Sequence, residues 1–149
     1  MMDNPYMREA LIEAQKAYNI DEVPIGAVIV YKDQIIGRGY NRKEQKKQAT
    51  SHAEIEAIQN AEEYLGTWNL SNCDLYVTLE PCPMCAGAIQ QARIRTVYYG
   101  AIDSKGGAIE SIVRLYNHKG FNHYPVTYGG ILEEECSNIL QEFFKSKRN

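Results

Sequence analysis

The amino-acid sequence predicts an α/β fold in which one mixed sheet is covered by helices on both faces. An opening β-rich hairpin, two later strand-like runs and the helical spacing between them support this prediction, because strands that alternate with helices form such layers. The chain has 149 residues, of which 44% are hydrophobic and 23% are charged. This length is enough for one hydrophobic core and too short for two ordinary domains, so we predict a single domain over residues 1–149.

The first helix is predicted over residues 7–18, where apolar side chains recur at helical spacing. Asn4 and Pro5 precede it in positions that favour a helix start. Residues 26–41 then contain two β-rich runs on either side of a Lys-Asp pair, a pattern typical of a hairpin. Helical spacing returns over residues 51–65, and Gly66 suits a left-handed helix end.

The middle of the chain predicts a strand, a helix and a second strand. Residues 73–80 are apolar and β-branched, as in a buried strand, and they lead into residues 81–94, whose prolines suit a helix start. Residues 96–101 favour another strand.

The C-terminal part is predicted to hold a helix around residues 110–117, a short strand within 124–129 and a final helix from Leu132 to Lys147. The sequence shows neither internal repeats nor linkers. One face of the last helix is predicted to carry Cys136, Ile139, Leu140, Phe143 and Phe144.

Composition and charge exclude several classes of protein. No apolar run approaches the roughly eighteen residues that cross a bilayer, and the N-terminus lacks the features of a secretory signal. The formal net charge of −3 argues against a chain coated in positive charge. We therefore expect a cytoplasmic protein without a membrane partner. Since the cytosol is reducing, its cysteines are expected to be buried thiols or metal ligands, with Cys73 and Cys136 in the core.

Two cysteines, Cys82 and Cys85, stand three positions apart between prolines at a predicted helix start. They could form a redox pair, close a small loop or hold a metal ion. Thiolates at this spacing can both point at one ion, and the positive end of the helix favours their deprotonated form. Together with His52 they would supply three ligands and leave the fourth tetrahedral position to water, which is typical of a catalytic zinc site.

Glu54 follows His52 by two residues. A carboxylate beside activated water can take its proton and pass it to a substrate nitrogen. Glu54 and His52 each have an alternative interpretation. Ser51 and Glu54 match a helix capping box, and His52, taken alone, would be a surface side chain in the first turn of the helix. An ideal helix separates His52 and Glu54 by about 200°, so they could converge on one site only at the helix start. The co-occurrence of all four residues favours the metal site.

These motifs resemble those of a known family. The sequences "HAE" and "PCPMC" are similar to the signature of the zinc-dependent nucleoside and base deaminases. Residues 7–147 resemble the bacterial tRNA adenosine deaminases of the TadA type. The resemblance rests on "EVPIGAVIV", "YNRK", "HAEIEA", "LYVTLEPCPMCAGAI", "VYYGAIDSKGGA", "FNH" and "GILEEECSNILQEFF".

The resemblance implies a three-layer α/β/α sandwich of the cytidine-deaminase-like kind, with a five-stranded mixed sheet. It implies a homodimer whose partner is the anticodon loop of a tRNA. The implied reaction is hydrolytic: water activated by zinc attacks C6 of an adenosine at the wobble position, inosine forms and ammonia leaves. Zinc is the one cofactor implied, one ion per subunit, and no organic cofactor is expected.

The resemblance also implies residue roles. His52, Cys82 and Cys85 would be the zinc ligands, and Glu54 would carry the proton. The implied substrate contacts are Asn41, Asp103 and Lys105, together with the C-terminal helix.

Two stretches depart from the family pattern. Residues 49–51 read Ala-Thr-Ser where Pro-Thr-Ala is common, and the paired glycines are followed by Ala108, Ile109 and Glu110, where small residues are more usual. The second departure lies within the 105–111 loop, where a glutamate could approach phosphate, so it bears on the expected RNA contacts more than on the zinc chemistry.

Other functions share some of these features. Deamination of a free base or nucleotide (guanine, cytidine or dCMP) would use the same zinc chemistry. A non-catalytic, zinc-stabilised RNA-binding module would not need Glu54. RNA binding would use basic side chains that a small substrate does not need, and the candidates are Arg42, Lys43, Lys46, Lys47, Lys145, Lys147 and Arg148. The apolar run at residues 84–94 is a candidate dimer interface.

Overall fold

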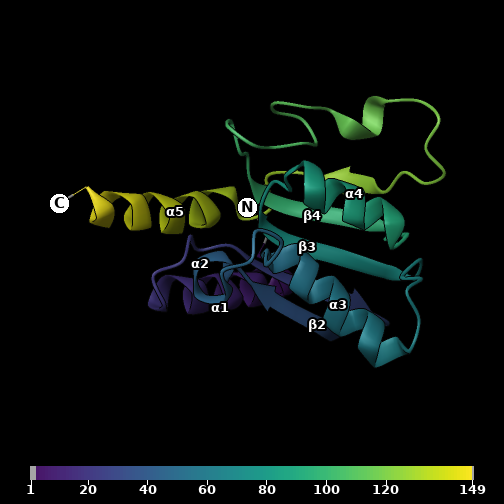
Figure 1. Ribbon diagram of the computed structural model, residues 1–149, viewed down its shortest axis with the longest axis horizontal. Coiled ribbons are helices and arrows are strands. Elements are labelled where there is room, and N and C mark those ends of the chain that lie inside the picture. Colours follow the sequence, from purple (N-terminus) through teal and green to yellow (C-terminus); the bar gives the residue numbers. More distant parts are fainter. Residues whose placement is uncertain (1–2, 149) are drawn as a thin grey trace.

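Residues 3–148 of the computed structural model form one sheet flanked by helices (Figure 1). Positions 1, 2 and 149 of the predicted domain lie outside the described residues. In chain order the elements are α1 (Pro5–Asn19), β1 (Gly26–Tyr31), β2 (Gln34–Tyr40), α2 (Lys43–Lys46), α3 (Ala53–Leu65), β3 (Cys73–Leu79), α4 (Pro83–Gln91), β4 (Thr96–Ala101), η1 (Leu115–Asn117), β5 (Val126–Tyr128) and α5 (Glu133–Lys147).

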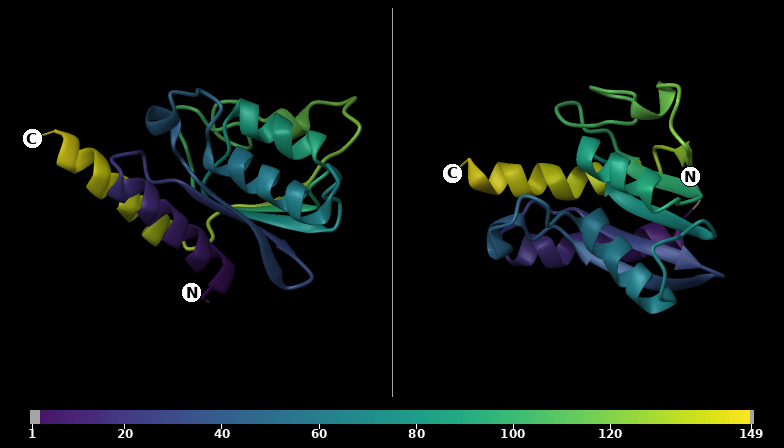
Figure 2. Two further views of the ribbon diagram at one scale, coloured as in Figure 1. Left: turned by 60° about the horizontal axis from the view of Figure 1, so that its bottom comes forward. Right: turned by 45° about the vertical axis from the view of Figure 1, so that its right-hand side comes forward.

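The five strands are arranged in the order β2-β1-β3-β4-β5. β1 is antiparallel to β2 and β3, whereas β3, β4 and β5 run parallel to one another. Helices α3 and α4 cover one face, and α1 and α5 lie side by side on the other (Figure 2). The predicted three-layer α/β/α fold with a five-stranded mixed sheet is confirmed.

Most predicted elements agree with the structure to within a few residues. The hairpin turn is made by Lys32 and Asp33, whose φ angles of 48° and 64° are those of a tight turn matched to the twist of the strands. Cys73 and Cys136 are fully buried, as predicted. Among residues 3–148, no helix combines the length and the apolar character that a membrane crossing requires.

The helix predicted around residues 110–117 is wrong. This stretch forms turns and the short helix η1. A helix over 110–117 would join the N–H of Leu115 to the carbonyl four residues earlier, but this N–H donates to Ala108, and the N–H groups of Ile112 and Val113 both donate to Gly107. The buried carboxylate of Glu80 fixes the start of this stretch by accepting from the N–H groups of residues 109–111.

Two smaller predictions also need correction, and one short helix was missed. Leu132 precedes α5 in a left-handed conformation (φ 50°), so the helix begins at Glu133. Phe144 does not share the buried face with Phe143, since 46% of its surface is exposed. The short helix α2 was not predicted; its N–H groups at Glu44 and Gln45 donate to the buried carboxylate of Glu22.

Small residues bring α3 unusually close to the sheet. Its inner face is formed by Ala53, Ala57 and Ala61, which are fully buried. A Cβ atom added at Gly39 would lie 2.2 Å from the carbonyl oxygen of Ala53, and one added at Gly37 would lie 2.3 Å from that of Ala57. The two glycines of β2 therefore allow backbone-to-backbone packing that no other residue permits.

The topology gathers three loops at one edge of the sheet. Because β2 and β3 are both antiparallel to β1, they run in the same direction, and β4 is parallel to β3. The carboxyl ends of β2, β3 and β4 thus meet at one edge, which is where α/β proteins bind ligands. Asn41, Cys82 and Asp103 follow these three ends.

We predict that Gly39→Ala lowers the free energy of unfolding by about 3 kcal/mol, because the added methyl meets backbone that cannot move aside. Urea unfolding at one protein concentration measures the change. Gly87→Ala in α4 is the matched control: no atom lies within 4 Å of its added Cβ, so it should stabilise by about 0.5–1 kcal/mol. Equal effects of the two substitutions would contradict this account of the α3 contact.

Candidate active site

His52 is placed by the start of α3. The helix begins at Ala53, and His52 is its N-cap residue in an extended conformation (φ −88°, ψ 155°). Because His52 lies outside the helix, helical periodicity does not separate its side chain from Glu54. The alternative capping box of Ser51 and Glu54 is wrong, since the Ser51 hydroxyl donates instead to the carboxylate of Glu56.

Cys82 and Cys85 are placed by the turn between β3 and α4. Cys82 is the N-cap of α4 and is half-buried, and Cys85 lies in the first turn and is fully buried. All four cysteines of the chain are free thiols. Both sulfur atoms therefore lie at the positive end of a helix, which favours thiolates.

The structure brings His52, Cys82 and Cys85 together. Their ligand atoms all lie within 4.8 Å of one another. The Nδ1 atom of His52 is 3.7 Å from the sulfur of Cys82 and 3.6 Å from that of Cys85. A tetrahedral ion with bonds of about 2.0 Å to nitrogen and 2.3 Å to sulfur separates those atoms by about 3.6 Å. The donor set and its spacing therefore fit zinc.

The charges of these groups also favour a cation. Hydrogen bonding from Cys85, followed by that with His52, lowers the pKa of Cys82 to about 4. The pKa of Cys85 is raised, first by its hydrogen bond with Cys82 and then by burial. One thiolate so close to the second thiol opposes its ionisation, and a divalent cation between them would remove that opposition.

Glu54 is buried beside this group, in the first turn of α3. Burial raises the pKa of Glu54 to about 7, and the negative charge of Cys82 acts in the same direction. Its carboxylate is not one of the three clustered ligand atoms. Glu54 can therefore exchange a proton near the group without being a ligand.

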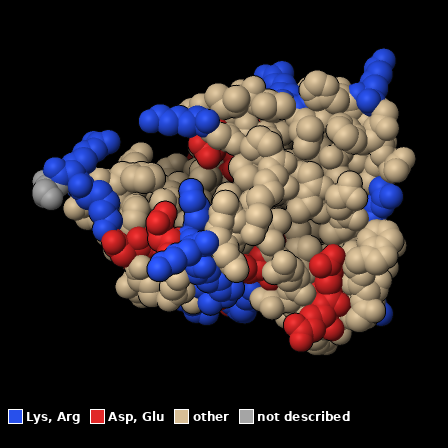
Figure 3. All heavy atoms as spheres, viewed as in Figure 1, with Lys and Arg blue, Asp and Glu red and all other residues tan. Residues whose placement is uncertain are grey.

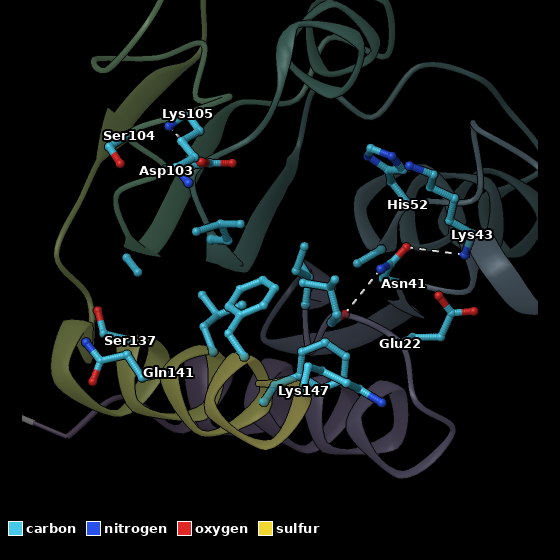
Figure 4. Close-up of a pocket in the computed structure, with 18 of the residues that line it drawn as sticks. Glu22, Asn41, Lys43, His52, Asp103, Ser104, Lys105, Ser137, Gln141 and Lys147 are labelled. Atoms are coloured by element: carbon cyan, nitrogen blue, oxygen red, sulfur yellow. Dashed lines mark hydrogen bonds between the residues drawn. The ribbon is translucent and has the colours of Figure 1, made fainter. Parts of the chain in front are cut away.

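A cavity of about 870 Å³ opens at this edge of the sheet (Figure 4). Asn41, His52, Asp103 and Lys105 line it, and α5 forms the opposite wall. Glu54, Cys82 and Cys85 do not line the cavity, so His52 is the predicted ligand that joins the cluster to it.

Asn41 is buried and its side chain is held by the surrounding loop. Its amide nitrogen donates to the carbonyl of Val23 at 3.2 Å, and its oxygen accepts from the N–H of Lys43 at 3.3 Å. Asp103 is half-buried, and one of its oxygens accepts from the N–H groups of Lys105 and Gly106 at 3.1 Å. Within residues 3–148 its other oxygen accepts no hydrogen bond, so this oxygen is available to a ligand.

Basic and acidic side chains share the rim of the cavity. Figure 3 shows Lys and Arg side chains gathered on the side of the molecule where α5 extends. Lys43 and Lys105 form no ion pair in the part of the chain that the structure describes, whereas Lys147 pairs with Asp21. Arg42 forms a bidentate salt bridge with Glu56 at 2.7–3.2 Å and so belongs to the scaffold.

Sequence reasoning missed the buried carboxylates that organise the loops, above all Glu80, which is 2% exposed. An acidic residue directly after a buried strand was the available signal. Glu110, one of the departures from the family pattern, lies away from the cavity, and its carboxylate accepts from the Tyr99 hydroxyl.

Known proteins with similar sequence or fold are deaminases. The MafB19-like deaminase family matches residues 1–148. The tRNA-specific adenosine deaminase of Bacillus subtilis (strain 168) is 47% identical over 146 residues, covering 98% of this chain and 91% of that protein. The protein of the same name from Agrobacterium fabrum (strain C58 / ATCC 33970) is 51% identical over 143 residues, covering 96% and 94%.

A solved structure from work on A-to-I editing by tRNA:A34 deaminases at the wobble position of transfer RNA has the same fold. It is 51% identical, its TM-score is 0.88, and the match covers 91% of this chain and 98% of that chain. Fold, motif and similarity over nearly the full length therefore agree: the chain belongs to the MafB19-like deaminases and, within them, to the bacterial tRNA-specific adenosine deaminase family.

Proposed function

We propose that the protein hydrolyses adenosine to inosine at the wobble position of a tRNA anticodon and releases ammonia. The observation that carries the proposal is the His52, Cys82 and Cys85 cluster, which has the spacing of a tetrahedral metal site and lies beside a buried carboxylate. The names of the curated relatives support the choice of substrate.

His52, Cys82 and Cys85 are the proposed ligands of one zinc ion per subunit. Three protein ligands leave the fourth tetrahedral position open, as in catalytic rather than structural zinc sites. When bound, zinc supplies Lewis-acid activation of water near neutral pH.

Glu54 is the proposed proton carrier. It takes one proton from the attacking water as the new C6–O bond forms and delivers it to N1 of the purine; it then takes the proton of the new C6 hydroxyl and delivers it to the amine, which leaves as ammonia as the C6–N bond breaks. Water and adenosine thus balance inosine and ammonia. The burial of Glu54 supports this role, because a carboxyl group in an apolar setting holds and releases a proton more readily near neutral pH.

The walls of the cavity would bind the RNA. Asn41 is proposed to contact the base, and Asp103 and Lys105 are proposed to contact the neighbouring RNA. An anticodon loop suits such a site, because its bases can be splayed out at low cost. Since tRNA is the substrate in this proposal, we also place the protein in the cytoplasm.

A homodimer is part of the same proposal. The outer surface between α3 and α4 carries a hollow of about 620 Å³ that Ile55, Trp68 and Ala88 help to line. Trp68 is 59% exposed. An exposed aromatic beside other apolar side chains is typical of an interface core. Polar side chains, among them Glu62 and Arg93, also line the hollow, and this surface includes the C-terminal part of the candidate run 84–94.

The substrate is tested by incubating the zinc-loaded protein with an anticodon stem-loop that carries adenosine at the wobble position, beside free guanine, adenosine and cytidine. We predict ammonia from the stem-loop alone. Glu54→Gln should lower kcat by about 100-fold or more while the zinc content stays at one per chain. Glu63→Gln, an exposed change on the same helix, is the control and should act as wild type. Ammonia from a free base alone, or an active Glu54→Gln variant, would contradict the proposal.

Lys43 and Lys105 are predicted to contact phosphate. Each change to Ala should reduce the slope of log affinity against log salt concentration by about 0.7–0.9, since one fewer counterion is released. Filter binding of the stem-loop at several salt concentrations measures the slope. Lys119→Ala, an exposed change away from the cavity, should leave the slope unchanged. Binding that does not depend on salt would instead favour a small substrate.

Light scattering tests the dimer. Wild type should have twice the 16.9 kDa mass of the chain, and Trp68→Arg should reduce the mass to that of one chain, because a charge would then lie in the apolar contact. Tyr64 is 64% exposed and lies outside the hollow, so Tyr64→Arg should remain dimeric. A monomeric wild type would contradict this part of the proposal.

A further inference from the structure

One buried carboxylate, that of Glu80, binds both ends of the loop that follows β4. Its Oε1 atom accepts from the N–H of Asp103 at 3.0 Å and from the hydroxyl of Ser111. Its Oε2 atom accepts from the N–H groups of Ile109, Glu110 and Ser111 at 3.0, 2.8 and 3.1 Å. The loop therefore closes on a single side chain.

The contacts require a carboxylate and not merely a side chain of that shape. Four of the five groups that donate to Glu80 are backbone N–H groups, which cannot accept a hydrogen bond. An amide of the same shape has one oxygen and would set its NH₂ group against backbone N–H groups. Such buried donors would then lose their partner, which is costly.

The loop is also fixed to the chain that leads into the cysteine turn. Ala108 donates to the carbonyl of Pro81 at 2.8 Å, and the N–H of Glu80 donates to the carbonyl of Ala101 at 2.9 Å. The backbone of Gly107 lies directly on the carboxylate, since a Cβ atom there would be 2.3 Å from the carboxyl carbon. Because Cys82 directly follows Pro81, the loop is hydrogen-bonded to the segment that carries the first cysteine of the cluster.

The other side of this loop forms part of the cavity. Asp103 and Lys105 line the cavity across from His52, whereas Glu80 does not line it (Figure 4). Any influence of Glu80 on a substrate must therefore be indirect, and the loop with Asp103 and Lys105 is the part bound to Glu80 that lines the cavity.

We propose that Glu80 is a positioning residue for substrate binding: it sets the place of Asp103 and Lys105 relative to the metal cluster without touching the substrate. This inference rests on the proposed function and deepens it. Contacts that hold substrate and transition state equally affect KM rather than kcat. Loss of the Glu80 contacts should therefore weaken binding much more than it slows the chemical step.

The test compares Glu80→Gln with Glu13→Gln in the zinc-loaded protein. Both carboxylates are 2% exposed, but Glu13 lies on α1 and pairs with Arg38 and Lys16, away from the cavity. Glu80→Gln should raise KM for the stem-loop about tenfold and change kcat less than about threefold, with zinc content as in wild type. Glu13→Gln should leave KM unchanged.

Hydrogen exchange supplies a readout that does not depend on activity. In Glu80→Gln the backbone amides of residues 103–111 should exchange about tenfold faster, because the donors lose their acceptor. Those amides should keep their wild-type rates in Glu13→Gln. If the wild type does not deaminate the stem-loop, the proposed function fails, and exchange alone decides whether Glu80 positions the loop.

Two further variants keep the proposal testable if Glu80→Gln does not fold. Ser111→Ala removes one donor and keeps the carboxylate, so it should raise KM in the same direction by a smaller factor. In a cycle of Ser111→Ala with Lys105→Ala, the KM effects of the two changes should be less than multiplicative. Wild-type KM and exchange in a folded Glu80→Gln or Ser111→Ala variant, or fully multiplicative effects, would overturn the proposal.

Discussion

The close contact between α3 and the sheet is the constraint on which the site depends. Gly37 and Gly39 remove side chains from the inner face of β2, and the alanines of α3 meet the bare backbone there. Since His52 immediately precedes the first of these alanines, the depth at which α3 lies also fixes the distance from the imidazole to the cysteine turn. A larger residue at either glycine would move the helix outward and pull the histidine from the thiols. The geometry of the His52, Cys82 and Cys85 cluster is thus set by the packing of residues that lie outside it.

Buried carboxylates carry out the second part of this positioning. Glu22 binds the start of α2, Glu56 holds Arg42 and Ser51, and Glu80 closes the loop after β4. Burial of a carboxylate is unfavourable unless donors surround it, and here backbone N–H groups or an arginine do so. Although burial acts to raise it, hydrogen bonds with Arg42 and Ser51 lower the pKa of Glu56 overall. Each loop around the cavity is therefore held by charge-assisted hydrogen bonds and not by apolar contacts alone.

The difference between local and long-range contacts explains which features could be predicted from the sequence. The metal cluster was predictable because each half is local: Cys82 and Cys85 share one turn, and His52 stands at a helix start. The strands and long helices follow from periodicity. The error at residues 110–117 has the opposite origin, since the carboxylate of Glu80, 30 positions before Glu110, fixes this stretch as a loop in which Leu115 donates to Ala108 and not to the carbonyl four residues earlier. An acidic residue after a buried strand indicates that Glu80 has partners, but sequence spacing does not reveal which groups they are, and the partners of Glu22 and Glu56 were hidden for the same reason.

The charge arrangement reconciles an acidic chain with the proposed binding of RNA. The net charge is −3, yet several acidic groups near the cavity are already engaged: Glu22 accepts backbone N–H groups, and Asp21 pairs with Lys147. Three further acidic residues, Glu133 to Glu135, lie in the first turn of α5, where the positive helix end favours them. Lys43 and Lys105, in contrast, form no ion pair within residues 3–148 and line the cavity from the start of α2 and from the loop after β4. A phosphate backbone entering there would meet these two cations as well as the carboxylates of Glu44 and Asp103, and this local charge at the cleft, rather than the sum over the chain, governs its approach.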